Sequence, residues 1–173
     1  MRQRLLVIGN GMAGMQMVER LVQRAPQRFA ITVIGREPHG NYNRVLLSPV
    51  LAGEMVFDET LIHDPDWYQR HGVTLLSGET VLQIDLAART LQTCQRRLGW
   101  DRLVFATGSR PRRPAIPGIE GDNVVTFRSI ADVRQLLAGE GPIVVLGGGY
   151  LGIEAAAALR ARGRAVRSEE RRV

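Results

Sequence analysis

Two short glycine-rich segments hold the residues whose spacing points most clearly to chemistry. The first is Gly9-Asn10-Gly11-Met12-Ala13-Gly14, and the second is Gly147-Gly148-Gly149-Tyr150-Leu151-Gly152. In a G-x-G-x-x-G pattern the first glycine permits a tight turn, the second lets the backbone approach a pyrophosphate, and the third lets a helix pack closely on a strand. Peptide N–H groups and the positive end of the helix dipole then hold the phosphate charge. Each segment therefore predicts a pyrophosphate site.

The sequence around the first segment supplies the elements that such a site requires. An apolar run at 4–8 predicts a buried parallel strand, apolar residues at helical spacing continue to Pro26, and a second apolar run covers 29–34. Together they predict a βαβ unit. Glu37 follows the second strand, 23 residues after Gly14, where an acid can bind a ribose hydroxyl. This context favours a nucleotide site over the alternative, a glycine-rich turn without a ligand.

The second segment repeats this pattern but its continuation differs. An apolar strand is predicted at 142–146 and an alanine-rich helix at 150–162, with Glu154 extending the motif. A second parallel strand should follow Gly163, yet residues 164–173 are mostly charged. We expect this tail not to form a central parallel strand, and we favour a truncated or altered end over a normal end with a solvated tail. The sequence thus predicts an incomplete second βαβ unit.

The rest of the chain predicts short elements joined by loops. Asp64 is expected to cap a helix that starts at Pro65 and ends before Gly72. The proline-rich stretch 111–117 is expected to be a linker or crossing strap. The further predicted elements are helical turns at 45–51, strands at 73–76, 80–85, 90–93, 102–107 and 123–127, and a helix at 129–137. The predicted fold class is α/β, a Rossmann-like doubly wound parallel sheet with a small β-hairpin insertion, followed by the start of a second βαβ unit.

Composition and charge exclude several classes of function. All 23 basic residues are arginine, and six of them lie in 160–173, so the net charge of +6 is concentrated in a tail. We therefore expect no nucleic-acid binding, because no basic helix face alternates with aromatic residues. Cys94 is the only cysteine, which excludes a disulfide, a thiol-pair redox centre and a cysteine-rich metal site; no metal is expected. The chain has no candidate membrane span and no export signal, which predicts a cytoplasmic protein without a membrane partner.

Taken together, the two glycine segments and Ala106-Thr107-Gly108 between them resemble the two-dinucleotide-binding-domain flavoproteins, the pyridine nucleotide-disulfide oxidoreductase fold. The absence of cysteine from 40–49 excludes the thiol-pair branch of that family. The segments Glu37-Pro38-His39-Gly40-Asn41-Tyr42-Asn43-Arg44 and Leu47-Ser48-Pro49-Val50-Leu51-Ala52-Gly53 look like the N-terminal flavoprotein region of the large subunit of NAD(P)H-dependent assimilatory nitrite reductase. This resemblance covers residues 1 to about 166.

The resemblance implies two cofactors, FAD on the first unit and NAD(P)H on the second. In the FAD site, Gly9 to Gly14 face the pyrophosphate and Glu37 the adenosine ribose. Arg44 and Ser48 would approach the flavin side, although Arg44 could instead anchor its loop. The backbone of Val81 would meet the adenine unless it is an ordinary strand valine, and the chain returns to the cofactor at Thr107 and Gly108. In the NAD(P)H site the implied residues are Gly147, Gly149 and Gly152 at the pyrophosphate and Glu154 towards the nicotinamide.

The same resemblance implies the domains and the activity. Residues 1–120 would be the FAD-binding portion, and 121–173 an incomplete NAD(P)H-binding domain with an atypical arginine-rich tail from about 164. Hydride would pass from NAD(P)H to FAD, and electrons onward to an iron–sulfur or sirohaem domain or a small electron-transfer protein. No side-chain catalyst is expected; His39, His63 and His71 are interpreted as loop or surface residues. The alternatives are a rubredoxin or ferredoxin reductase, or a non-catalytic truncated FAD-binding fragment, since the family's closing FAD motif is absent from the 173 residues.

Overall fold

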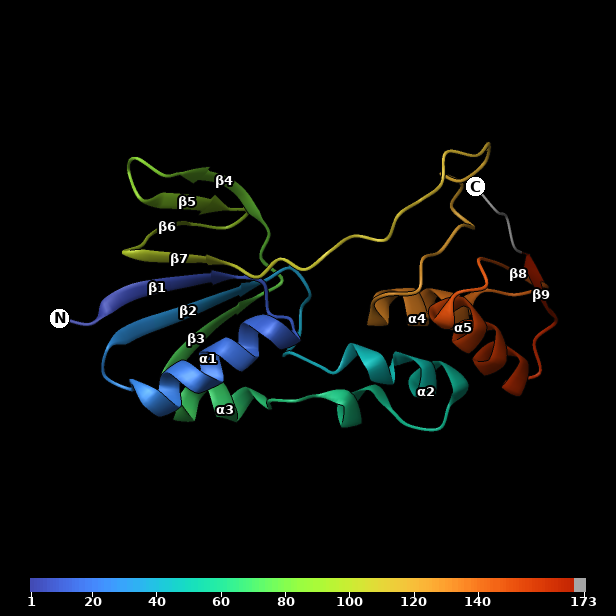
Figure 1. Cartoon of the computed structure of the whole chain (residues 1–173), viewed down its shortest axis with the longest axis horizontal. Coiled ribbons are helices and arrows are strands. Elements are labelled where there is room, and N and C mark those ends of the chain that lie inside the picture. The colour runs from blue at the N-terminus through green and yellow to red at the C-terminus, as the bar shows by residue number, and fades with distance from the viewer. Residues whose placement is uncertain (170–173) are drawn as a thin grey trace. The chain divides into compact units, whose positions relative to one another are not determined.

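The computed structural model describes residues 1–169 and divides the chain into two compact units (Figure 1). Unit 1 consists of Met1–Tyr42 and Leu61–Ser109, and unit 2 consists of Asn43–Thr60 and Arg110–Val173. Each unit is therefore built from two stretches of sequence, and the short segment 43–60 belongs to the same unit as the residues from Arg110 onward.

A four-stranded parallel sheet forms the centre of unit 1. Its strands are β1 (Gln3–Ile8), β2 (Phe29–Gly35), β3 (Val73–Ser77) and β7 (Arg102–Phe105), in the spatial order β3-β2-β1-β7. The helices are α1 (Met12–Arg24), which connects β1 to β2, and α3 (Pro65–Arg70), which precedes β3. The predicted βαβ unit and the predicted strands in this region are confirmed. Asp64 caps α3 as predicted, because its carboxylate accepts a hydrogen bond from the N–H of Trp67 at 2.6 Å.

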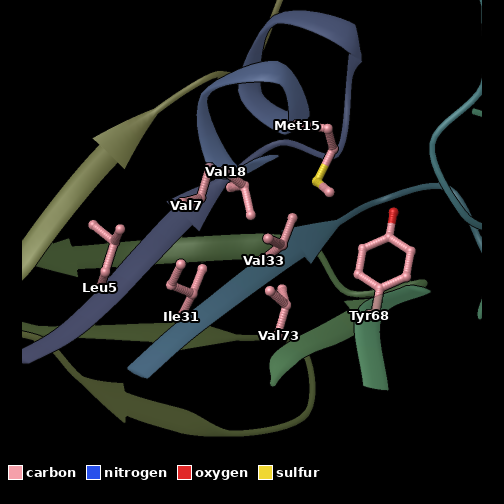
Figure 2. Packing of buried hydrophobic residues seen from close by; sticks show 8 residues of the cluster. All are labelled: Leu5, Val7, Met15, Val18, Ile31, Val33, Tyr68 and Val73. Atoms are coloured by element: carbon pink, nitrogen blue, oxygen red, sulfur yellow. The ribbon is translucent and has the colours of Figure 1, made fainter. Parts of the chain in front are cut away.

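One face of this sheet packs against α1 and α3 to form the main core (Figure 2). Alternate residues of the strands point to this face, as the two-residue period of a strand requires. Burial of this apolar surface contributes about 25 cal/mol per Å². The buried members of the cluster are Leu5, Val7, Met15, Val18, Ile31, Val33, Tyr68 and Val73.

A three-stranded antiparallel sheet packs against apolar residues on the other face of the parallel sheet. It consists of β4 (Val81–Asp85), β5 (Thr90–Thr93) and β6 (Arg97–Gly99) in that spatial order. Leu91 of β5 is buried with Leu6 and Ile8 of β1, so the small sheet shares a second apolar cluster with the parallel one. The predicted hairpin insertion is confirmed. Sequence analysis missed β6, which is only three residues long and shows no apolar alternation.

Unit 2 contains one parallel strand pair and several short helices. The segment 43–60 forms η1 (Arg44–Leu46), α2 (Leu47–Ala52) and η2 (Phe57–Thr60), and the later segment forms α4 (Ile130–Ala138), β8 (Ile143–Leu146), α5 (Tyr150–Ala161) and β9 (Val166–Glu169). β8 pairs with β9, and α2 packs against α4 and α5. Ser129 begins α4 with a capping box formed with Asp132, so the predicted helix is confirmed.

One expectation for unit 2 is wrong, and the expectation for the tail holds only for a central strand. Residues 166–169 do form a parallel strand, because the backbone of β9 pairs with β8 while the side chains of Arg167 and Ser168 stay exposed. Charge therefore does not prevent pairing at the edge of a two-stranded sheet. The strand predicted at 123–127 does not form. The Thr126 hydroxyl donates instead to Asp132, the same carboxylate that caps α4. The tail residues 170–173 lie outside the described residues.

Arginines of the tail bind backbone carbonyls within unit 2. The Arg162 guanidinium donates to Leu51 O at 2.5 Å and so satisfies a carbonyl in the last turn of α2. Arg164 donates to Gly139 O at 2.6 Å and Gly141 O at 2.9 Å, beside the end of α4. Two of the arginines in 160–173 therefore bind carbonyl groups at or beside helix ends. In residues 1–169, no helix combines the length and apolar character needed to cross a bilayer.

Candidate functional site

The first glycine turn lies where β1 ends and α1 begins, and two of its glycines are required by close packing. Gly9 has φ +114°, and a Cβ added there would lie 2.1 Å from the carbonyl oxygen of Ala106. A Cβ on Gly14 would lie 2.8 Å from the Cβ of Ala106. Because both positions are glycine, α1 can start close to the carboxyl end of β1, beside the residues that follow β7.

Gly11 differs from both, because its surroundings are open. A Cβ built there would meet no atom of residues 1–169 within 4 Å, and its φ of −86° is one that any residue adopts. Gly11 is the N-cap of α1, and no side chain caps this helix end. A helix start with free N–H groups, an open approach and the positive end of the dipole suits an anion such as a diphosphate.

Glu37 lies two residues beyond β2, in a position fixed by its neighbours. Its Oε2 accepts a hydrogen bond from the hydroxyl of Tyr42 at 2.8 Å, and His39 Nε2 lies 3.5 Å from the same oxygen. Tyr42 is buried, so the carboxylate is attached to a rigid part of the unit. Because β1, β2 and β7 are parallel, Glu37, the glycine turn and the residues after β7 all follow the carboxyl ends of their strands.

The remaining predicted residues of unit 1 occupy the ends of strands. Thr107 and Gly108 follow β7 and are exposed; Gly108 has φ +68°. Ala106, just before them, donates its N–H to Ile8 O at 2.8 Å and so holds this segment beside the glycine turn. Val81 begins β4, pairs with Thr93 and adjoins a register shift in the hairpin. A bulge of this kind commonly marks the neighbourhood of a binding site.

The second glycine turn reproduces the first at the level of hydrogen bonds. Gly9 N–H donates to Ile34 O at 2.8 Å, and Gly147 N–H donates to Glu169 O at 2.9 Å. Gly147 has φ +117°, and Gly149 is the N-cap of α5. Among residues 1–169, no side chain caps this helix and no atom lies within 4 Å of a Cβ added at Gly149. A Cβ on Gly152 would lie 2.0 Å from the carbonyl oxygen of Gly147. The internal repeat predicted from the sequence is therefore confirmed as a second βαβ turn.

The predicted flavin-side residues Arg44 and Ser48 lie in unit 2, together with the second glycine turn. Ser48 Oγ donates to Glu154 Oε2 at 2.6 Å, which joins α2 to the second turn of helix α5. Arg44 donates to Arg128 O at 3.0 Å, a contact that anchors its loop to the segment before α4. Anchoring by Arg44 was the alternative that sequence analysis left open, and this contact favours it.

Sequence analysis did not identify a buried polar cluster behind the first glycine turn. His63, interpreted as a loop or surface residue, lies in a loop but is 7% exposed, and its Nδ1 is 2.9 Å from Asn41 Oδ1. Burial lowers the pKa of His63 below its ordinary value of 6.5, with smaller opposing effects of nearby carboxylates. The Tyr68 hydroxyl lies 3.1 Å from Asn10 Oδ1 in the glycine turn and 3.2 Å from Asn41 Oδ1. In the sequence, the only sign of this cluster was the segment 37–44, which resembles the nitrite reductase family and contains Asn41.

Comparison with known proteins decides the family. The family model for pyridine nucleotide-disulphide oxidoreductases matches residues 3–173. The chain belongs to the pyridine nucleotide-disulphide oxidoreductase family. It is 43% identical over 163 residues to an assimilatory nitrate reductase electron transfer subunit of Bacillus subtilis (strain 168), covering 92% of this chain and 21% of that protein. It is 40% identical over 162 residues to a nitrite reductase [NAD(P)H] of the same organism, covering 91% of this chain and 20% of that protein.

A solved structure extends the likeness to a ferredoxin reductase. The crystal structure of a ferredoxin reductase for the CYP199A2 system from Rhodopseudomonas palustris superposes with a TM-score of 0.85 at 28% identity, covering 96% of this chain and 42% of that one. The α/β fold and the membership of an oxidoreductase family predicted from the sequence are thus confirmed. This family member spans about a fifth of the length of the two Bacillus proteins.

Proposed function

We propose that unit 1 binds the adenosine diphosphate half of FAD, and that the chain is the N-terminal part of an NAD(P)H oxidoreductase of the nitrite reductase large-subunit type. One observation supports this above all: the turn at Gly11 offers uncapped helix N–H groups and an open approach, and Glu37 follows the parallel strand next to β1. The residues present therefore fit a nucleotide diphosphate with its ribose. The relatives in Bacillus subtilis support the reductase class.

The chain's own residues would bind and orient the cofactors. Amides at the start of α1 would hold the FAD pyrophosphate, and the carboxylate of Glu37 would accept hydrogen bonds from the adenosine ribose. Amides at the start of α5, around Gly149, would hold the pyrophosphate of NAD(P)H in the same way. When bound, the flavin supplies the redox chemistry, accepting a hydride from the nicotinamide and releasing electrons singly or in pairs. No side chain of this protein needs to move a proton in that step.

The same proposal assigns one cofactor to each of two parts of the chain. Residues 1–120 would contain the FAD-binding portion, and 121–173 the start of an NAD(P)H-binding domain, with Ser48 and Glu154 near the flavin and nicotinamide. An iron–sulfur or sirohaem domain, or a small electron-transfer protein, would accept the electrons. The likeness to a ferredoxin reductase supports the small-protein acceptor as the second candidate. A cytoplasmic location remains part of this proposal.

Titration of the 173-residue chain with FAD, measured by calorimetry, tests whether unit 1 binds FAD. In Gly11→Ala a methyl group would enter the space in front of the helix N-terminus, and FAD affinity should fall at least about tenfold, equal to about 1.4 kcal/mol. Gly139→Ala, at the end of α4, is the matched control: its backbone is extended and an added Cβ meets only ordinary contacts at 3.6 Å. Equal FAD affinity in Gly11→Ala and wild type would contradict the proposed site.

Anaerobic addition of NADH to the FAD-loaded chain tests the redox claim separately. Bleaching of the flavin absorbance supports a working hydride relay within these residues. Bound flavin that stays oxidised supports the alternative, a fragment that binds FAD without catalysing its reduction. The acceptor can be tested by adding ferredoxin or rubredoxin to the reduced form and following reoxidation of the flavin.

A further inference from the structure

A buried hydroxyl on α3 reaches the first glycine turn from outside the βαβ unit. The ring of Tyr68 belongs to the main core, 3% exposed, between residues of α1 and the parallel sheet (Figure 2). Its hydroxyl lies at the far side of the ring from α3, 3.1 Å from Asn10 Oδ1 and 3.2 Å from Asn41 Oδ1. It also accepts a hydrogen bond from the backbone N–H of Asn41 at 3.3 Å.

Asn10 is the residue between the first two glycines of the motif and directly precedes Gly11. Besides the contact with Tyr68, its Nδ2 donates to His39 O at 3.3 Å. Gly35 lies directly beneath it: a Cβ at Gly35 would be 2.9 Å from the Cβ of Asn10. The side chain is thus packed on β2 and hydrogen-bonded on two sides.

The network behind Asn10 is closed and polar, which makes it sensitive to the loss of one group. Asn41 is 1% exposed, and its Oδ1 faces both the Tyr68 hydroxyl and His63 Nδ1. Its Nδ2 has no hydrogen-bond partner within the part of the chain that the structure describes. Tyr68 has a single phenolic hydrogen, so it donates to one of the two amide oxygens at a time. Burial raises the pKa of Tyr68, which keeps the hydroxyl protonated near neutral pH.

We infer that Tyr68 is a positioning residue of the nucleotide site: its hydroxyl fixes the Asn10 side chain and thereby the peptide N–H groups of the first glycine turn. This inference rests on the proposed function of unit 1. Tyr68 does not touch the nucleotide; it holds the turn in the conformation that receives a diphosphate before the ligand arrives. Preorganised donors bind an anion more tightly because less ordering is needed on binding.

A double-mutant cycle measured by FAD calorimetry tests this inference. Loss of one hydrogen bond should raise the dissociation constant in Tyr68→Phe about five- to tenfold. Asn10→Ala removes the other partner, and the double variant should bind FAD no more weakly than the weaker single variant, within about twofold, because one interaction is removed twice. A purely structural role would lower the melting temperature of Tyr68→Phe and leave FAD affinity of the folded protein unchanged.

Asp101→Asn is the matched control, because Asp101 binds Arg4 at the amino end of β1, on the other edge of the sheet. It should lower stability and change FAD affinity by less than about twofold. If Tyr68→Phe binds FAD as wild type does, or if the two single effects add in the double variant, the inference is wrong. If the wild-type chain itself does not bind FAD, the proposed function of unit 1 fails instead, so the two failures are distinguishable.

Discussion

At the scale of single residues, Glu37 is the group on which the proposed ribose contact depends. Glu37→Gln keeps the size of the side chain but removes the charge that strengthens hydrogen bonds from ribose hydroxyls, which contribute roughly 1.5–3 kcal/mol when the acceptor is charged. FAD affinity measured by calorimetry should therefore fall about tenfold or more. Asp85→Asn, an equivalent change at the β4–β5 turn, should leave it unchanged. Unaltered affinity in Glu37→Gln would remove the ribose role.

The buried His63 predicts a pH dependence of the stability of unit 1. Because burial lowers its pKa in the folded state below the ordinary 6.5, the unfolded chain binds a proton more readily. The neutral side chain therefore contributes stability above pH 6.5, and this contribution is lost as the pH falls through 6.5 towards the lower folded pKa. Urea unfolding followed by fluorescence of Trp67 and Trp100, both in unit 1, should show a larger decrease between pH 7.5 and 5.5 for wild type than for His63→Gln.

Charged groups near His63 provide further variants and a control for that experiment. Glu19 and Asp64 raise the pKa of His63, and His71 lowers it, so variants of these residues should move the midpoint in the matching directions. The Arg4 guanidinium lowers the pKa of Asp101, so this carboxylate stays ionised throughout pH 5.5–7.5 and does not contribute to the difference. Identical pH profiles for wild type and His63→Gln would show that His63 does not titrate with folding.

At the scale of elements, the first glycine turn separates residues needed for folding from Gly11, the residue proposed to face the ligand. Gly9→Ala combines a positive φ with a Cβ 2.1 Å from Ala106 O, so it should destabilise unit 1 on the order of 3 kcal/mol. Gly14→Ala should also destabilise it, through Ala106. Gly11→Ala meets open space at an ordinary φ, so it should cost only about 1 kcal/mol, as expected for alanine at an N-cap. Tryptophan fluorescence in urea measures all three.

Sequence patterns predicted the elements of this turn because they are local. The period of apolar residues, the glycine spacing and the cap at Asp64 each depend on a few neighbouring residues, and the structure confirms the elements they predicted. β6 was missed because three residues are too few to show a period. The charges of the tail argued only against a central strand, and β9 forms at the edge of a two-stranded sheet, which leaves charged side chains in solvent.

At the scale of the whole molecule, long-range packing could not be predicted from local patterns. Residues 43–60 lie in the middle of the predicted FAD-binding region, yet they pack in unit 2. Ser48 with Glu154 and Arg162 with Leu51 O join positions more than one hundred residues apart. In the sequence, Ser48, Glu154 and Arg162 are isolated polar residues, and no local pattern indicates that they form these contacts. The polar network at Asn41 and Tyr68 escaped prediction for the same reason.

These contacts predict a local effect of Ser48→Ala. Loss of its hydrogen bond to Glu154 should weaken unit 2 by about 0.5–1.5 kcal/mol. Hydrogen exchange followed by mass spectrometry should become faster in peptides of α2 and α5, while the fluorescence-detected unfolding of unit 1 stays unchanged. A matched variant, Ser77→Ala at the end of β3, changes the same side chain in unit 1. Unchanged exchange in α2 and α5 would show that this hydrogen bond does not hold the two helices together.

The central claim is that the turn at Gly11 receives a diphosphate and that Glu37 binds the adjoining ribose. A crystal structure of the chain with FAD tests it most directly. We expect the pyrophosphate oxygens within hydrogen-bond distance of peptide N–H groups at the start of α1, and a ribose hydroxyl on the carboxylate of Glu37. Density for the nucleotide at another place, with this turn left free and Glu37 bound only by its protein neighbours, would contradict the account.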